Sequence, residues 1–289
     1  MPVGLATVIG ARPGVARDLS PRLPSAPPVE LAADALAPVD GDGALVAFLR
    51  TLRGRTEPIV VSLTGPVTLD LDLRRRGIEV EESARTATVA VSRAASSLLD
   101  TVQRIVPGAG VLLFLQEPVL ANSMHPTFPL GPDEISDLVS EVVDEVATTH
   151  PGDDVVLGVQ VDGRADWAML LRTGIGALAA PISAHLETAA AEIDRFLRSG
   201  GIVAGGAVPV DEPLGLSADR LWKRLSDLWC ELSRRGIDPL LLRERSIITP
   251  SAALGNFGLS QAQRIVSLSE DLATRVLRQS LGVKLSIGA

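Results

Sequence analysis

The sequence predicts an α/β fold, a single (β/α)₈ TIM barrel that spans residues 1–289. Short β-rich runs alternate with longer amphipathic runs, and this alternation indicates βα units around a parallel sheet. The strand candidates number eight, which is what a closed (β/α)₈ barrel requires. Hydrophobic residues make up 46% of the chain, aromatic residues only 3%, and Tyr is absent. A core of Leu, Val, Ile and Ala suits parallel strands buried on both faces.

Seven strand candidates are short apolar runs bounded by Gly, Pro or polar residues. A weaker eighth candidate lies near Pro28–Leu31, inside a Pro- and Ala-rich stretch from Ala11 to Gly43. That stretch lacks helical periodicity, and we interpret it as an irregular excursion within one domain. The seven clear candidates are Leu5–Gly10, Ile59–Leu63, Val111–Leu115, Val155–Val161, Ala177–Ser183, Ile202–Ala207 and Ser246–Thr249.

Helices are predicted where apolar residues recur at helical spacing and capping residues mark the ends. Asp133 and Glu134 favour a helix N-terminus, Gly200-Gly201 favours a C-terminus, and Ser217 and Ser260 are N-cap candidates. The predicted helices are Glu82–Val106, Asp133–Thr148, Leu186–Ser199, Leu216–Arg235 and Ser260–Leu281.

Charge and cysteine content exclude several classes of partner. The net charge is −8, and an acidic surface repels phosphate backbones, so we expect no nucleic-acid partner. No apolar run reaches the length of a membrane span, and Met1–Leu5 resembles a strand start rather than a signal peptide. Cys230 is the single cysteine, which excludes an intramolecular disulfide and a multi-cysteine metal site. We therefore expect a cytoplasmic protein, and the oligomeric state stays open.

Four motifs occur in the order found in one known family. Thr7–Gly14 resembles T-x-I-G-S-x-P-x, and Leu63–Leu69 matches an L-T-G-P-V-T segment almost letter for letter. Gln116–Leu120 resembles D-E-P-x-L, and Thr249–Leu254 resembles N/T-P-x-C-G-L. Together they resemble the C-terminal barrel of cobalamin-independent methionine synthase, including its shorter single-barrel actinobacterial relatives. The resemblance implies a barrel of the methionine synthase and uroporphyrinogen decarboxylase-like type, with its site at the C-terminal strand ends.

The resemblance also implies a zinc ion that activates a thiol, but the ligands are missing. The family takes them from H-x-C after the fifth strand, a Glu after the sixth and a Cys after the eighth. Here the fifth strand continues as Val159–Gly163, the sixth is followed by Ala184-His185, and Ala252 stands at the last position. Zinc needs N, S or O ligands, so we expect no zinc and no other cofactor.

Candidate site residues follow the predicted strands, where the C-terminal face of a barrel builds its site. Catalytic candidates are His185, Glu117 and Asp162; substrate-binding candidates are Arg12, Glu30, Thr64, Gln116 and Arg164; there is no metal ligand. Each has a structural alternative. His185 suits a packing or capping role, Asp162 and Arg164 suit a turn with a solvated ion pair, and Arg12 could pair with Glu117 or Glu30. Gly205-Gly206 and Gly255–Gly258 could serve a phosphate site, although a turn suffices for the second segment.

The leading functional hypothesis is a divergent methionine synthase-like barrel that has lost the zinc site and methionine synthase activity. It would bind a small metabolite, such as an amino acid or a thiol, or a protein partner. The first alternative is an active methyl- or alkyl-transferase that uses Glu30, Gln116, Glu117, Asp162 and His185. The second alternative is a non-catalytic subunit beside an active paralogue.

Overall fold

The computed structural model describes residues 4–9, 23–26, 28–31, 43–151, 154–210, 217–252, 254 and 257–286. Strands and helices alternate along the chain, which confirms the α/β class and a TIM-barrel-like order of elements. The chain divides into two compact units. The central unit is Ser25–Ala177, and the terminal unit combines Val3–Pro24 with Leu178–Ala289. Within the described residues, no helix has the length and apolar character needed to cross a membrane.

The sheet of the central unit is parallel. Ser25, at the end of β2 (Leu23–Ser25), pairs with Val60 of β3 (Ile59–Thr64). β3 pairs residue by residue with β4 (Val111–Gln116), and β4 pairs likewise with β5 (Val155–Gln160). Nearly every residue of these three strands is buried, as expected for parallel strands covered on both faces.

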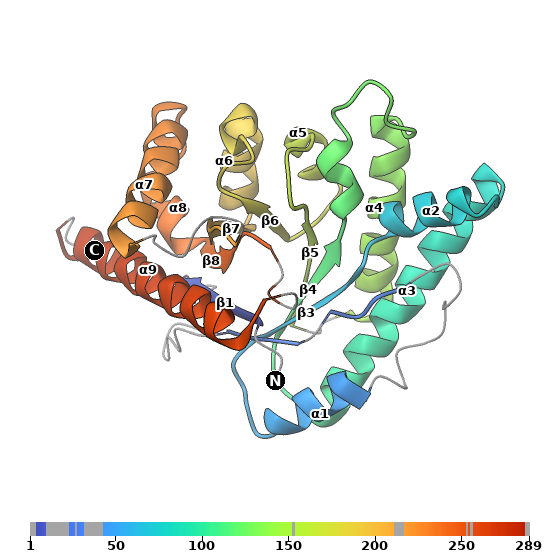
Figure 1. Cartoon of the computed structure of the whole chain (residues 1–289), viewed down its shortest axis with the longest axis horizontal. Coiled ribbons are helices and arrows are strands. Elements are labelled where there is room, and N and C mark those ends of the chain that lie inside the picture. The colour runs from blue at the N-terminus through green and yellow to red at the C-terminus, as the bar shows by residue number, and fades with distance from the viewer. Residues whose placement is uncertain are drawn as a thin grey trace. The chain divides into compact units, whose positions relative to one another are not determined.

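Helices of the central unit pack beside this sheet and on one another (Figure 1). Leu98, Leu99 and Val102 of the longest one are fully buried, as the helical spacing of apolar residues predicts. The helical elements are α1 (Gly43–Thr51), α2 (Pro66–Arg75), α3 (Val80–Ile105), the 3₁₀ turn η2 (Pro118–Asn122), α4 (Pro132–Thr149) and α5 (Trp167–Leu170).

In the terminal unit, β6 (Ala177–Pro181) neighbours β7 (Ile202–Val208), and β7 runs parallel to β8 (Ser246–Pro250). The helices α7, α8 and α9 contact one another (Figure 1). The helical elements are η3 (Leu186–Ala189), α6 (Ala190–Arg198), α7 (Ala218–Arg234), α8 (Pro239–Glu244) and α9 (Leu259–Ser286).

One strand departs from the predicted barrel. β1 (Gly4–Ile9) pairs with β8 in the antiparallel sense, with Thr7 opposite Ile248. The prediction of eight parallel strands is therefore wrong at β1. A parallel strand needs a crossover connection, usually helical, and the Pro-rich sequence after β1 carries no helical periodicity to supply one.

The second strand also differs in position from the prediction. β2 is at Leu23–Ser25, whereas the weak candidate at Pro28–Leu31 contributes one bridge, from Val29 to Leu63. Pro27 and Pro28 have no N–H to donate, so a continuous ladder cannot run through them. The other predicted strands are confirmed within two residues. The short helices α1, α2, α5 and α8 were not predicted.

Candidate functional site

Three neutral polar side chains end adjacent strands of the central unit. Thr64, Gln116 and Gln160 are the last residues of β3, β4 and β5, and they are paired in register. Residues in register on parallel strands project to the same face of a sheet. Each is half-buried, whereas the residues before them on the strands are buried. We call these three residues the polar row.

Hydrogen bonds hold each member of the polar row. Gln116 donates from Nε2 to Ser62 Oγ at 3.2 Å, and Gln160 donates from Nε2 to Asp162 Oδ1 at 3.1 Å. Thr64 Oγ1 accepts from the backbone N–H of Leu31 at 2.9 Å. These bonds orient the two amides so that their oxygens can accept from a ligand, and they leave the Thr64 hydroxyl proton able to donate.

Glu117 follows the polar row residue of β4 but is fully buried. Its Oε1 accepts the backbone N–H of Val67 at 2.8 Å, and its Oε2 accepts the backbone N–H of Thr68 at 2.7 Å. The Thr68 hydroxyl donates to the same Oε2 at 2.5 Å. The carboxylate of Glu117, which follows β4, therefore caps the N-terminus of α2, which follows β3.

This α2 cap accounts for every backbone donor of the first helical turn. The N-cap residue Gly65 has no side chain, and Pro66 has no N–H. Val67 and Thr68 donate to Glu117, and Leu69 makes the first bond to Gly65 O at 3.1 Å. A negative charge at a helix N-terminus is also favoured by the helix dipole.

Gly65 is required by how closely the carboxylate approaches. A Cβ at this position would lie 2.2 Å from Glu117 Oε1, so another residue cannot fit while the α2 cap is in place. Gly65 also donates its N–H to Gln116 O at 2.9 Å, and Glu117 donates its N–H to Gln160 O at 2.8 Å. The α2 cap and the polar row thus share one continuous backbone network.

Burial raises the pKa of Glu117 from 4.5 to about 7. The hydrogen bonds from Thr68 and Val67 act in the opposite direction because they stabilise the charged form. The negative charge of Asp70 raises the pKa further. A carboxyl group with such a pKa changes its charge near neutral pH.

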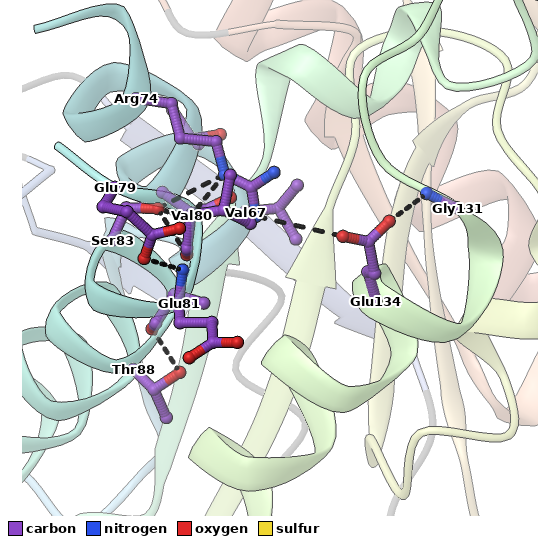
Figure 2. A network of polar contacts seen from close by, with 12 residues as sticks. Val67, Arg74, Glu79, Val80, Glu81, Ser83, Thr88, Gly131 and Glu134 are labelled. Atoms are coloured by element: carbon purple, nitrogen blue, oxygen red, sulfur yellow. Dashed lines mark hydrogen bonds and ion pairs between the residues drawn. The ribbon is translucent and has the colours of Figure 1, made fainter. Parts of the chain in front are cut away.

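Asp70 is a second fully buried carboxylate, on the same helix. It pairs with Arg74 at 2.9 Å, and Ser83 Oγ donates to it at 2.6 Å. Figure 2 shows Arg74 beside Ser83, with Glu134 further along bonded to Gly131; Arg74 lies 4.0 Å from Glu134. The pair is enclosed by three helices, α2, α3 and α4, so we assign it a structural role.

The remaining central-unit candidates lie at the surface. Glu30 and Arg164 are exposed, and Asp162 is exposed while it accepts from Gln160. Arg12 lies outside the described residues, so its predicted ion pair with Glu117 or Glu30 stays a prediction. Of the predicted site residues, the structure brings Thr64, Gln116 and Asp162 into the polar row or into contact with it.

His185 lies in the terminal unit, just after β6. Its φ of 59° places it in the left-handed region, where it is the N-cap residue of η3. The side chain is 57% exposed, and its Nδ1 lies 3.0 Å from Glu187 Oε1. The imidazole is thus oriented by a carboxylate, and it makes no side-chain hydrogen bond that caps η3.

Close packing requires glycine at position 206 of β7 but not at position 205. A Cβ at Gly206 would lie 2.8 Å from Ser251 Cα and 3.1 Å from Pro181 Cα, so neighbouring backbone excludes a side chain. At Gly205, a Cβ would make an ordinary contact of 3.4 Å with Ile182 Cγ2. Close packing explains Gly206 without a phosphate site.

The residues present do not fit the zinc ion that the family resemblance implies. Gln160 and Val161 stand in the fifth-strand segment where the family has H-x-C, and the Gln160 amide is bonded to Asp162. Ala252, two residues after β8, carries no side-chain ligand atom. Across the described part of the chain, no three His, Cys, Asp or Glu side chains gather as a metal site would require.

Gln160, Ser62 and Gly65 were missed as parts of this site. Gln160 lies in the segment Val159–Gly163, which is notable in the sequence for lacking the zinc ligands of the family. Ser62 lies inside a buried apolar run. A usable signal was present: a polar residue ends each of three otherwise apolar strands, and in parallel strands such ends meet at one edge.

Comparison of the sequence with protein-family profiles and with curated proteins yields no match. Among solved structures, the chain is similar to a Xaa-Pro dipeptidase with bound methionine in the active site, with 12% identity, a TM-score of 0.37, and coverage of 88% of this chain and 74% of that one. It is also similar to a protein assigned as a fructose-1,6-biphosphate aldolase from Coccidioides immitis, with 12% identity, a TM-score of 0.28, and coverage of 88% and 87%. Similarities this low carry no functional argument.

Proposed function

We propose that the chain is a divergent methionine synthase-like barrel that has lost zinc-dependent thiol activation and binds a small metabolite through the polar row. The observation that carries this proposal is the register of Thr64, Gln116 and Gln160, three hydrogen-bonding side chains on one face at the strand ends. Ligand sites of α/β proteins lie at such ends.

The motif residues that the chain retains have structural roles, whereas those that it lacks are the zinc ligands, and this difference supports the proposal. Gly65 and Glu117, which the resemblance shares with the family, form the α2 cap. The segment Val159–Gly163 contains neither His nor Cys, and Ala252 stands at the position of the last zinc ligand. The architecture of the strand ends is kept while the atoms needed for thiolate activation are gone.

The charges near the polar row favour an ammonium-bearing or neutral ligand over an anion. The row itself is uncharged, and the carboxylate bonded to it is Asp162. Two amide oxygens and a carboxylate can accept hydrogen bonds from an ammonium group. An amino acid or a small amino thiol fits this description, with the exposed Arg164 nearby in sequence for its carboxylate.

Two measurements test the proposal. Metal analysis of the purified protein should find no stoichiometric zinc, and stoichiometric zinc would overturn the loss of the metal site. Titration calorimetry with methionine, homocysteine and inorganic phosphate should detect binding of an amino acid and not of phosphate. The variants Gln116→Ala and Gln160→Ala should each weaken that binding by about 10-fold, the loss of a hydrogen bond or two.

Gln263→Ala is a matched control, because Gln263 is exposed on α9 and lies outside the polar row. It should leave binding unchanged. If neither amino acid binds, or if binding survives both polar-row substitutions, the polar row is not the ligand site.

A further inference from the structure

Among the described residues, Glu117 is the one fully buried carboxylate whose oxygens accept the backbone N–H groups left without a helical partner in the first turn of a helix. Both oxygens accept, and Oε2 accepts twice. A charged carboxylate can accept all three bonds, whereas a protonated one must use one oxygen as a donor. Addition of a proton to Oε2 therefore reverses the bond with the Thr68 hydroxyl or breaks one bond of the α2 cap.

The polar row lies one residue from this carboxylate on each of two strands. Thr64 precedes Gly65, the residue in contact with Glu117 Oε1, and Gln116 precedes Glu117 itself. The backbone bonds from Gly65 to Gln116 and from Glu117 to Gln160 join the ends of all three strands. A change in the position of the carboxylate or of the first turn of α2 thus acts on all three members of the row.

We propose that the charge of Glu117 sets the geometry of the polar row: the α2 cap has one pattern of hydrogen bonds when the carboxylate is ionised and another when it is protonated, and the strand ends follow the change. This inference rests on the proposed function only in taking the polar row as the ligand site. An ammonium-bearing ligand of the row would bind more tightly as the nearby Glu117 acquires its negative charge, so its affinity would rise with pH.

The groups that face Glu117 are consistent with a change of charge near neutral pH. From α2, Asp70 acts on it through its charge, and the Asp70 charge is itself balanced by Arg74. From β3 and β5 come Gly65 and the Gln160 carbonyl, neither of which titrates. Burial supplies the largest effect and raises the pKa of Glu117 to about 7.

The test uses the ligand-free, full-length protein, with ¹⁵N-labelled glutamine and backbone amides followed by NMR from about pH 5 to about pH 9. The side-chain amides of Gln116 and Gln160 and the amides of Val67 and Thr68 should titrate with one midpoint near pH 7. In Glu117→Gln this common transition should vanish. If the polar row amides still titrate in this variant, or do not titrate in the original protein, the proposal is wrong.

A second variant keeps the carboxyl group and so guards against misfolding of Glu117→Gln. Thr68→Val removes the hydroxyl that donates to Oε2, a bond that lowers the pKa of Glu117. It should move the midpoint to higher pH, and an unchanged midpoint would contradict the assignment to Glu117. Failure of the ligand titrations would remove the proposed function without touching this result, because the NMR experiment contains no ligand.

Discussion

Glu117 Oε1 accepts the backbone N–H of Val67 at 2.8 Å, across 50 residues of sequence. This bond joins the two motifs that most resemble the family, the T-G-P-V-T segment and the E-P dipeptide. Gly65 leaves room for the carboxylate, Pro66 removes a donor, and Thr68 adds a hydroxyl. The two motifs together build a helix cap, so their presence argues for the fold and not for any reaction.

Replacement of Gly65 by Ala should be strongly destabilising. The new Cβ would lie 2.2 Å from Oε1 of a carboxylate that three hydrogen bonds hold in place, so the α2 cap must break or move. We expect a loss of about 3 kcal/mol in the free energy of unfolding, measured by urea denaturation. Gly43→Ala is the control, since a Cβ there meets nothing within 4 Å in α1, and it should be neutral or slightly stabilising.

The free energy of unfolding should depend on pH through Glu117. Its pKa is about 7 in the folded protein against 4.5 ordinarily, so the folded state binds more protons between these values. The contribution of Glu117 to stability is therefore fully present below pH 4.5 and is lost as pH rises through about 7. The shift corresponds to about 3 kcal/mol, and the fall should be smaller by that amount in Glu117→Gln. Equal slopes for the two proteins would contradict the raised pKa.

The helices that the sequence predicts well are those with long apolar periodicity. α3 and α4 match within about two residues because their buried faces and end signals are local in sequence. α2 was missed because its cap is not local: Gly65 offers no capping side chain, and the residue that does the capping is Glu117. A helix capped by a residue from another strand lacks the local capping side chain that marks a helix start.

The candidate site was likewise predicted in its local features and missed in its non-local ones. Thr64 and Gln116 were predicted through the family resemblance, and neither was predicted to be aligned with Gln160. Register fixes that alignment, and register depends on pairing between strands that are far apart in sequence. The antiparallel direction of β1 is equally non-local, since its partner β8 lies at the other end of the chain.

Two adjacent glycines of β7 should respond in opposite ways to Ala. Gly205 lines a small apolar cavity of about 20 Å³, and a Cβ there makes an ordinary 3.4 Å contact with Ile182. Gly205→Ala should stabilise the protein by about 0.5–1 kcal/mol, since it fills space and lowers the entropy of the unfolded chain. Gly206→Ala should destabilise it by about 2 kcal/mol, because the Cβ would meet backbone at 2.8 Å. Thermal unfolding of both variants tests this ordering.

The buried ion pair on α2 has an exposed counterpart on the same helix. Asp70 and Arg74 are 0% and 16% exposed, whereas Asp72 and Arg76 are 34% and 46% exposed, and both pairs are separated by four residues. Asp70→Asn should cost about 3 kcal/mol because Arg74 is left without its buried partner. Asp72→Asn should cost less than about 0.5 kcal/mol. Similar costs in urea denaturation would mean that burial does not govern these pairs.

Asp70→Asn should also act on Glu117. The negative charge of Asp70 raises the pKa of Glu117, so its removal should lower the midpoint of the Glu117 transition. Asp72→Asn is again the control and should leave that midpoint where it is. A midpoint followed by NMR that does not fall in Asp70→Asn would show that the two carboxylates do not interact.

Substitutions of His185 test whether this residue acts through its backbone conformation or through its imidazole. Its φ of 59° is unfavourable for any residue with a Cβ, by about 1 kcal/mol. Its exposed contact with Glu187 adds little to the stability of the folded protein. His185→Gly should therefore leave stability unchanged or raise it by up to about 1 kcal/mol, whereas His185→Ala should not, because Ala keeps the strain. If Gly at this position instead lowers the melting temperature more than Ala does, the imidazole itself holds the turn, and the pair with Glu187 is stronger than its exposure implies.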